Sequence, residues 1–158
     1  MTVTRNTYVD GKAARPHHMP IKWEKLSQDT SLPAVEASIE DKTTLVARIG
    51  LMMLKGGTES WHVTNIMDRM ARVLGVTCVT DLGLLSIDCT CMQNDGQTYT
   101  SVVNLASPGV DTQLIWRTEN LMQDIEASDD YLTVGQIHRE MDKIEKTPRR
   151  YSAAQVGF

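Results

Sequence analysis

Two adjacent glycines, Gly56 and Gly57, separate two segments whose apolar residues recur at the spacing of an amphipathic helix. Ser38 and the acidic residues after it are typical of a helix N-terminus, and Gly75 stands where a glycine commonly ends a helix. The two apolar stripes are formed by Leu45, Ile49, Met52 and Met53, and by Val63, Ile66, Met67, Met70 and Leu74. The sequence therefore predicts a helical hairpin over residues 39–75, with the two glycines at its corner.

Beyond this hairpin the apolar period changes from that of a helix to that of a strand. Apolar and polar residues alternate over 84–92 and again over 97–105. The Asn-Asp-Gly sequence at 94–96 is a tight-turn signal. These patterns predict an antiparallel hairpin, to which residues 76–81 can add a third strand.

Two further helices follow the predicted sheet. Asp111 can cap the first helix, while Thr133 and Gln136 form a capping-box pattern for the second, which Pro148 stops. The apolar positions of the last helix form a narrow seam, typical of packing against another helix. The element order predicts an α+β fold: a helical hairpin, a small antiparallel sheet of two to three strands, and two helices packed on the sheet.

The charge and hydropathy of the chain exclude several classes of protein. The 158 residues carry a formal net charge of -4, which argues against a general nucleic-acid binder. No run of about 18 apolar residues is present, and the N-terminus lacks the pattern of a signal peptide. We therefore expect a domain that stays in the cytosol.

The three cysteines, Cys78, Cys89 and Cys91, lie in apolar, strand-like segments. We expect them to be small buried hydrophobic residues in a reducing compartment. The Cys89–Cys91 pair has no matching second pair, so the sequence predicts no zinc site. No cofactor motif and no metal site are expected.

The corner between the first two helices is the most unusual local sequence. Backbone amides at the start of the second helix can bind an anion or a carboxylate, with hydroxyl groups beside them. The alternative is structural: the glycines make the turn, and Thr58 or Ser60 caps the next helix. The corner is not a phosphate loop, because no strand precedes it and no Gly-Lys-Ser/Thr follows it. The candidate ligand-binding residues are Gly56, Gly57, Thr58, Glu59 and Ser60.

No catalytic constellation is evident in the sequence, so no catalytic residue is assigned. Ser60, His62 and Glu59 are neighbours along the chain, but adjacent residues of a helix point in different directions. His62 is expected on the solvated polar face of its helix, and His138 is expected on the surface of the last helix. The methionines of the two apolar stripes are interpreted as packing residues.

The run from Leu45 to Ser60, followed by Val63 and by residues 69–75, resembles the cytoplasmic N-terminal domain of the threonine/serine exporter family. In that family an apolar helix ends in a Gly-Ala or Gly-Gly corner with Thr, Glu or Ser beside it, and a second helix closes with Leu-Gly. The resemblance covers roughly residues 38–151 and rests on the order of the elements.

The resemblance implies a non-enzymatic function in transport: ion-driven export of threonine, serine or related small amino acids in bacteria. The chain is then the soluble domain at the cytoplasmic face of the membrane, with a regulatory, gating or assembly role. Its partners are a membrane-embedded remainder or partner subunit, and a homo-oligomer is possible. A small hydrolase-like or ligand-binding domain that uses the Gly56-Gly57 corner, or an oligomerising interaction module, is the alternative.

The same interpretation predicts three parts along the chain. Residues 1–37 form a flexible N-terminal arm, and residues 38–148 form the cytoplasmic α+β domain. Residues 149–158, which begin with two arginines, form a juxtamembrane stub before a missing membrane region.

Overall fold

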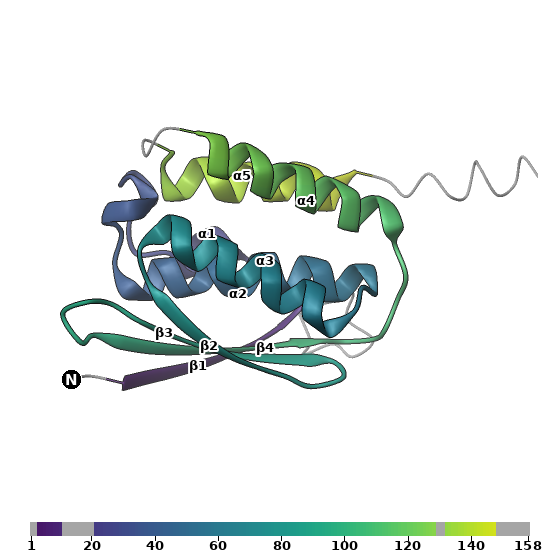
Figure 1. Cartoon of the computed structure of the whole chain (residues 1–158), viewed down its shortest axis with the longest axis horizontal. Coiled ribbons are helices and arrows are strands. Elements are labelled where there is room, and N and C mark those ends of the chain that lie inside the picture. Colours follow the sequence, from purple (N-terminus) through teal and green to yellow (C-terminus); the bar gives the residue numbers. More distant parts are fainter. Residues whose placement is uncertain (1–2, 11–20, 129–131, 148–158) are drawn as a thin grey trace, which may run out of the picture.

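A four-stranded sheet with helices on one of its faces makes up the described part of the chain, which is residues 3–10, 21–128 and 132–147 of the computed structural model (Figure 1). The strands are ordered β1-β4-β3-β2 across the sheet. Their bounds are β1 Val3–Asp10, β2 Thr77–Leu82, β3 Ser86–Met92 and β4 Thr98–Leu105.

Strands β2, β3 and β4 form the predicted antiparallel sheet, including its third strand. Strand β1 pairs with β4 in parallel, with Val3 opposite Thr98. It lies within residues 1–37, which were expected to form a flexible arm. The segment contains Val, Thr and Tyr, which favour strands. Its apolar and polar residues do not alternate cleanly, so the alternation pattern did not predict a strand here.

Six helical segments accompany the sheet in the described part of the chain. The predicted hairpin consists of α2 and α3, and the last two predicted helices are α4 and α5. Two short elements, α1 and the 3-10 helix η1, precede the hairpin. The bounds are α1 Trp23–Leu26, η1 Ala34–Glu36, α2 Ile39–Gly56, α3 Ser60–Leu74, α4 Thr112–Ala127 and α5 Val134–Lys146. The α+β class predicted from the sequence is confirmed.

The hairpin of α2 and α3 covers the sheet, and α4 and α5 lie over the hairpin on its side away from the sheet (Figure 1). Helix α2 contacts β3 and β4 on one side and α4 and α5 on the other. Its side chains are buried around most of the helix, as in a central core helix. Helices α4 and α5 were expected to pack on the sheet, but they pack on the hairpin, because α2 and α3 lie between them and the strands.

The helix ends follow the predicted local chemistry. Ser38 Oγ accepts a hydrogen bond from the Asp41 amide at 3.2 Å, and Asp111 Oδ1 accepts one from the Leu114 amide at 3.1 Å. The capping box of Thr133 and Gln136 is present. Each of these side chains satisfies an amide that the helix itself leaves unpaired. The methionines of both stripes are buried, which confirms their packing role.

Candidate functional site

The glycine corner is a tight packing point between the hairpin and the segment that leads into α4. Gly57 has a φ of 83°, a left-handed conformation that favours glycine. A Cβ on Gly57 would lie 2.6 Å from the carbonyl oxygen of Gly109, and one on Gly56 would overlap Ile115. The Asp111 amide also donates to the Gly56 carbonyl at 2.9 Å. Gly57 is therefore required by the left-handed turn, and both glycines are required by the close approach of residues 109–115.

The other three corner residues do not cap α3 with a side chain as expected. Glu59 holds the N-cap position, and its side chain makes no capping hydrogen bond. Instead, its carboxylate accepts a hydrogen bond from the indole Nε1 of Trp61. Ser60 is the exposed first residue of α3. The prediction that Thr58 or Ser60 caps this helix was wrong, because Thr58 bonds to a histidine one turn further along.

Thr58, His62 and Glu119 form a chain of hydrogen bonds at the corner. Thr58 Oγ1 lies 3.0 Å from His62 Nδ1, and His62 Nε2 lies 2.7 Å from Glu119 Oε1. An ionised carboxylate only accepts hydrogen bonds, so Nε2 carries a proton; in the neutral imidazole Nδ1 then accepts from the Thr58 hydroxyl. His62 is half-buried and paired on both ring nitrogens. The expectation of a solvated His62 was wrong, because α4 packs over that face of α3.

Arg69 holds Glu119 in its ionised form. Arg69 Nη1 donates to Glu119 Oε2 at 2.7 Å, and its Nη2 donates to Glu126 at 2.6 Å. Burial raises the pKa of Glu119, but the hydrogen bonds from His62 and Arg69 outweigh it and leave that pKa below its ordinary value. Glu119 is therefore a charged acceptor that orients the His62 imidazole.

Exposed apolar side chains surround this chain of hydrogen bonds. Trp61 and Trp116 are each about two-thirds exposed, and Val110 is also exposed. The Trp61 ring stacks on the His62 imidazole, with 5.2 Å between ring centroids. Trp116 precedes Glu119 by three residues on α4, so the two residues share one face of that helix. The corner thus combines a polar chain with an apolar rim.

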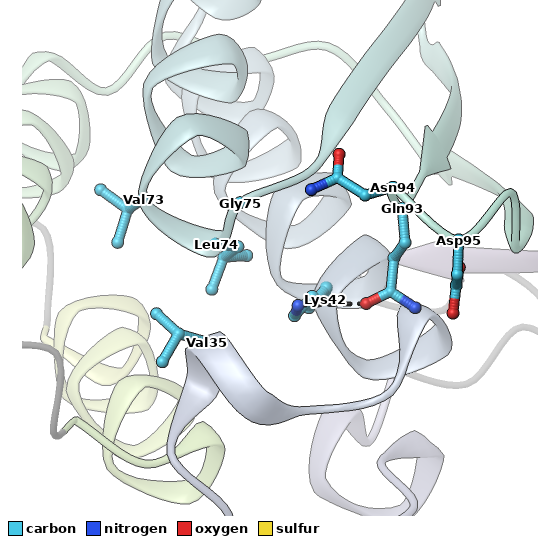
Figure 2. Close-up of a pocket in the computed structure, with 8 residues that line it drawn as sticks. All are labelled: Val35, Lys42, Val73, Leu74, Gly75, Gln93, Asn94 and Asp95. Atoms are coloured by element: carbon cyan, nitrogen blue, oxygen red, sulfur yellow. Dashed lines mark hydrogen bonds between the residues drawn. The ribbon is translucent and has the colours of Figure 1, made fainter.

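A second site, which the sequence analysis did not identify, is a cavity of about 410 Å³ near the other end of α3 (Figure 2). Lys42 of α2 lies in it and is only 6% exposed. Its Nζ donates to Gln93 Oε1 at 3.1 Å. The cavity is lined by Val35, Lys42, Val73, Leu74, Gly75, Gln93, Asn94 and Asp95.

The cavity at Lys42 presents both signs of charge. Burial lowers the pKa of Lys42, and the Asp95 carboxylate opposes that shift. Helix α3 ends at Leu74 and Gly75, so its C-terminal carbonyl groups lie at the cavity wall and add partial negative charge. Lys42 follows Ile39 by three residues and precedes Leu45 by three. A helical projection therefore places Lys42 on the buried stripe of α2. This spacing is the one signal in the sequence that could have indicated a buried lysine.

A buried ionic cluster joins α2 to α5 and belongs to the framework of the fold. Arg48 is 2% exposed, and its Nη2 lies 2.6 Å from both Asp142 Oδ1 and Glu145 Oε1. Arg48 Nη1 donates to His138 Nδ1 at 2.9 Å. His138 is wholly buried, so the prediction of a surface histidine was wrong. It lies beside Val134 and Met141 on the buried seam of α5.

The cysteines also depart from the expectation. Cys78 and Cys91 form a disulfide between β2 and β3, while Cys89 is a free, buried thiol. The expectation that all three cysteines act only as small buried hydrophobic residues was wrong for this pair, since the strand register places Cys78 directly opposite Cys91. Alternation within a single strand does not reveal which residue of a neighbouring strand lies opposite.

Among the helices of the described residues, none has both the length and the apolar character needed to cross a bilayer. The expected juxtamembrane stub at 149–158 lies outside the described residues.

Comparison with known proteins identifies one family. The sequence pattern of the family described as "Putative threonine/serine exporter" matches residues 44–158, which include most of α2 and every element that follows it. No curated protein and no solved structure matches the chain. Because the match covers more than half of its length, the chain belongs to the threonine/serine exporter family.

Proposed function

We propose that this chain serves the export of threonine, serine or related small amino acids as a domain at the cytoplasmic face of the membrane. Family membership supports the relation to export. Its role is to regulate, gate or assemble a membrane-embedded remainder or partner subunit, with transport driven by an ion gradient. A domain that regulates export needs to detect the exported solute, and the cavity at Lys42 has the chemistry to do so.

The observation that carries this proposal is a buried ammonium group in a cavity that also holds negative charge. A small α-amino acid is a zwitterion. Its carboxylate can accept hydrogen bonds from Lys42, whose ammonium carries three N–H donors, one of which bonds to Gln93. Its ammonium group is matched by Asp95 and by the carbonyl end of α3. Val35 and Val73 add an apolar wall for the side chain.

The size of the cavity agrees with this ligand class. Ligand pockets in proteins span roughly 300–1,000 Å³, and the cavity of about 410 Å³ lies near the lower end of that range. An amino acid with a short polar side chain is therefore better suited to it than a nucleotide or a peptide. Asn94 and Gln93 offer amide groups that can bond to a side-chain hydroxyl.

Calorimetric titration of the full chain with L-threonine and L-serine tests the proposal. We expect saturable binding that Lys42→Met weakens about tenfold or more, because a hydrogen bond between two charged groups is lost. The amide analogues of both ligands, which lack the carboxylate, should bind equally weakly to both proteins. The matched control is Lys143→Met, which removes an exposed lysine of α5. Equal binding by the wild type and Lys42→Met would contradict the proposal.

A second candidate function, acyl hydrolysis at the corner, is favoured by the Thr58–His62–Glu119 chain. In this reaction Thr58 Oγ1 attacks a carbonyl carbon while His62 Nδ1 takes the hydroxyl proton, and Glu119 steadies the resulting imidazolium. His62 then passes the proton to the leaving group, and water releases the acyl group from Thr58. The residue set is that of a nucleophile, a base and an orienting acid.

Hydrolysis of an activated ester by the full chain tests this second function. We expect the rate to fall at least tenfold in Thr58→Val and in His62→Gln, because either change removes a member of the chain. Thr64→Val, which alters a half-buried threonine of α3 outside this chain of hydrogen bonds, is the matched control. An ester hydrolysis rate that is the same in all three variants and the wild type would exclude catalysis at Thr58.

A further inference from the structure

The three cysteine sulfur atoms gather at one place on the inner face of the sheet. Cys89 and Cys91 are two residues apart on β3, so both side chains point to the same face, and their Sγ atoms lie 3.8 Å apart. Cys78 lies opposite Cys91 on β2. All three Sγ atoms lie within 4.8 Å of one another. Strands of different register would not produce this cluster.

We propose that the reduced form of this protein binds one soft, thiophilic cation, Cu(I), through the sulfur atoms of Cys78, Cys89 and Cys91. Soft thiolate ligands favour Cu(I), zinc and iron–sulfur clusters over the harder biological cations. For metal–sulfur bonds of about 2.3 Å, three sulfur atoms around one ion lie about 4 Å apart. The Cys89 and Cys91 Sγ atoms already lie at 3.8 Å, near that value, and the bonded Cys78 and Cys91 sulfur atoms must move apart to reach it once the disulfide is opened.

The composition of the cluster favours Cu(I) over Zn²⁺. Structural zinc sites have four ligands. Among the described residues, the group that could hold a metal consists of the three cysteines alone, with no histidine or carboxylate in it. A three-sulfur set is complete for Cu(I) but leaves zinc one ligand short. The Asp68 carboxylate acts electrostatically on Cys89 from α3 and adds negative charge near the bound cation.

The position of the cluster gives both shielding and access. Cys89 and Cys91 are wholly buried, and the core side chains around them exclude water from a bound ion. Cys78 is half-buried on β2, which is an edge strand of the sheet. An ion can therefore enter from the sheet edge, bind Cys78 first, and then pass to the inner pair.

The disulfide makes the oxidised and metal-binding forms mutually exclusive. Cys78 and Cys91 are joined in the structure, which removes two of the three thiolate donors. A phosphine and water convert this bond into two thiols and a phosphine oxide, which restores the full ligand set. Burial and the charge of Asp68 raise the pKa of Cys89 to about 12, so the incoming cation must displace a proton from that thiol.

Anaerobic titration with Cu(I) tests the inference on the full chain. Phosphine-reduced protein competes for Cu(I) with a coloured chelator, and the absorbance of the chelate reports how much metal the protein removes. We expect one equivalent to be removed and at least tenfold weaker retention in Cys89→Ser. Similar weakening is expected in Cys78→Ser, which alters the half-buried ligand on β2. The unreduced protein should remove far less metal.

The matched control is Met92→Leu, which removes a soft sulfur at the exposed end of β3 without touching the cluster. It should retain Cu(I) as the wild type does. Either of two results would overturn the inference: reduced wild-type protein that takes no Cu(I) from the chelator, or Cys78→Ser and Cys89→Ser variants that retain Cu(I) as strongly as the wild type.

Discussion

The buried imidazole of His138 makes the stability of the fold depend on pH. Arg48 Nη1 donates to His138 Nδ1 at 2.9 Å, and the other ring nitrogen lies 3.3 Å from Ser27 Oγ. Burial is the main cause that lowers the pKa of His138 from 6.5 to about 3, with the Arg48 charge acting in the same direction and Asp142 opposing it. The folded protein therefore keeps this imidazole neutral where the unfolded chain has already bound a proton.

The size of the effect follows from this difference in pKa. Because the folded pKa lies below the unfolded value, the free energy of unfolding falls as the pH falls from 6.5 towards 3. The loss is up to about 1.4 kcal/mol per pH unit, so acidification from pH 7 to pH 5 removes roughly 2 kcal/mol. That loss is a large part of the free energy of unfolding of an ordinary domain, which is roughly 5–15 kcal/mol.

Urea denaturation at pH 7 and pH 5 measures the loss in the wild type and in His138→Asn. The asparagine oxygen can replace Nδ1 as the acceptor for Arg48 but binds no proton. We expect the loss of unfolding free energy on acidification to be roughly 2 kcal/mol larger in the wild type. An equal loss in the two proteins, or an NMR titration of the His138 imidazole near pH 6.5, would refute the reasoning.

Three further predictions concern the turn, a helix cap and the corner acid. Gly75→Ala places a side chain in open space at positive φ and should lower the free energy of unfolding by about 1 kcal/mol. Gly57→Ala also overlaps a carbonyl oxygen and should lower that free energy by more than about 2 kcal/mol. Urea denaturation of both variants measures the two losses. Thr133→Ala removes the α5 capping box and should lower the free energy of unfolding by about 1 kcal/mol. The control Thr112→Ala, at the first position of α4, should lower it by less. Glu119→Gln should lower it by about 1 kcal/mol at pH 7. Since the pKa of Glu119 is lowered in the folded state, that difference should vanish as acid protonates the wild-type carboxylate.

The helices and the antiparallel strands could be predicted because their signals are local. Ser38, Gly57 and Gly75 mark helix ends through interactions with residues only a few positions away. The alternation in β3 likewise reflects one buried face. Strand β1 was missed because its partner β4 is nearly a hundred residues away and the two strands pair in parallel, so no turn joins them.

The functional candidates were harder to predict because distant partners create them. Thr58 and His62 are four residues apart at the start of α3, but Glu119, which orients the imidazole, comes from α4. The Lys42 cavity depends on the turn after β3 meeting the end of α3. The sequence does show that Lys42 lies on a buried stripe. What it does not show is that a cavity opens beside its ammonium group.

Export of labelled threonine from cells tests the central claim most directly. Cells that produce this protein, together with any membrane partner that it serves, are loaded with threonine. The release of threonine is compared between the wild type, Lys42→Met and the Lys143→Met control. We expect release by the wild type to rise with internal threonine, Lys42→Met to abolish or shift this dependence, and Lys143→Met to leave it unchanged. Release that responds to internal threonine identically in all three proteins would contradict a sensing role for this domain.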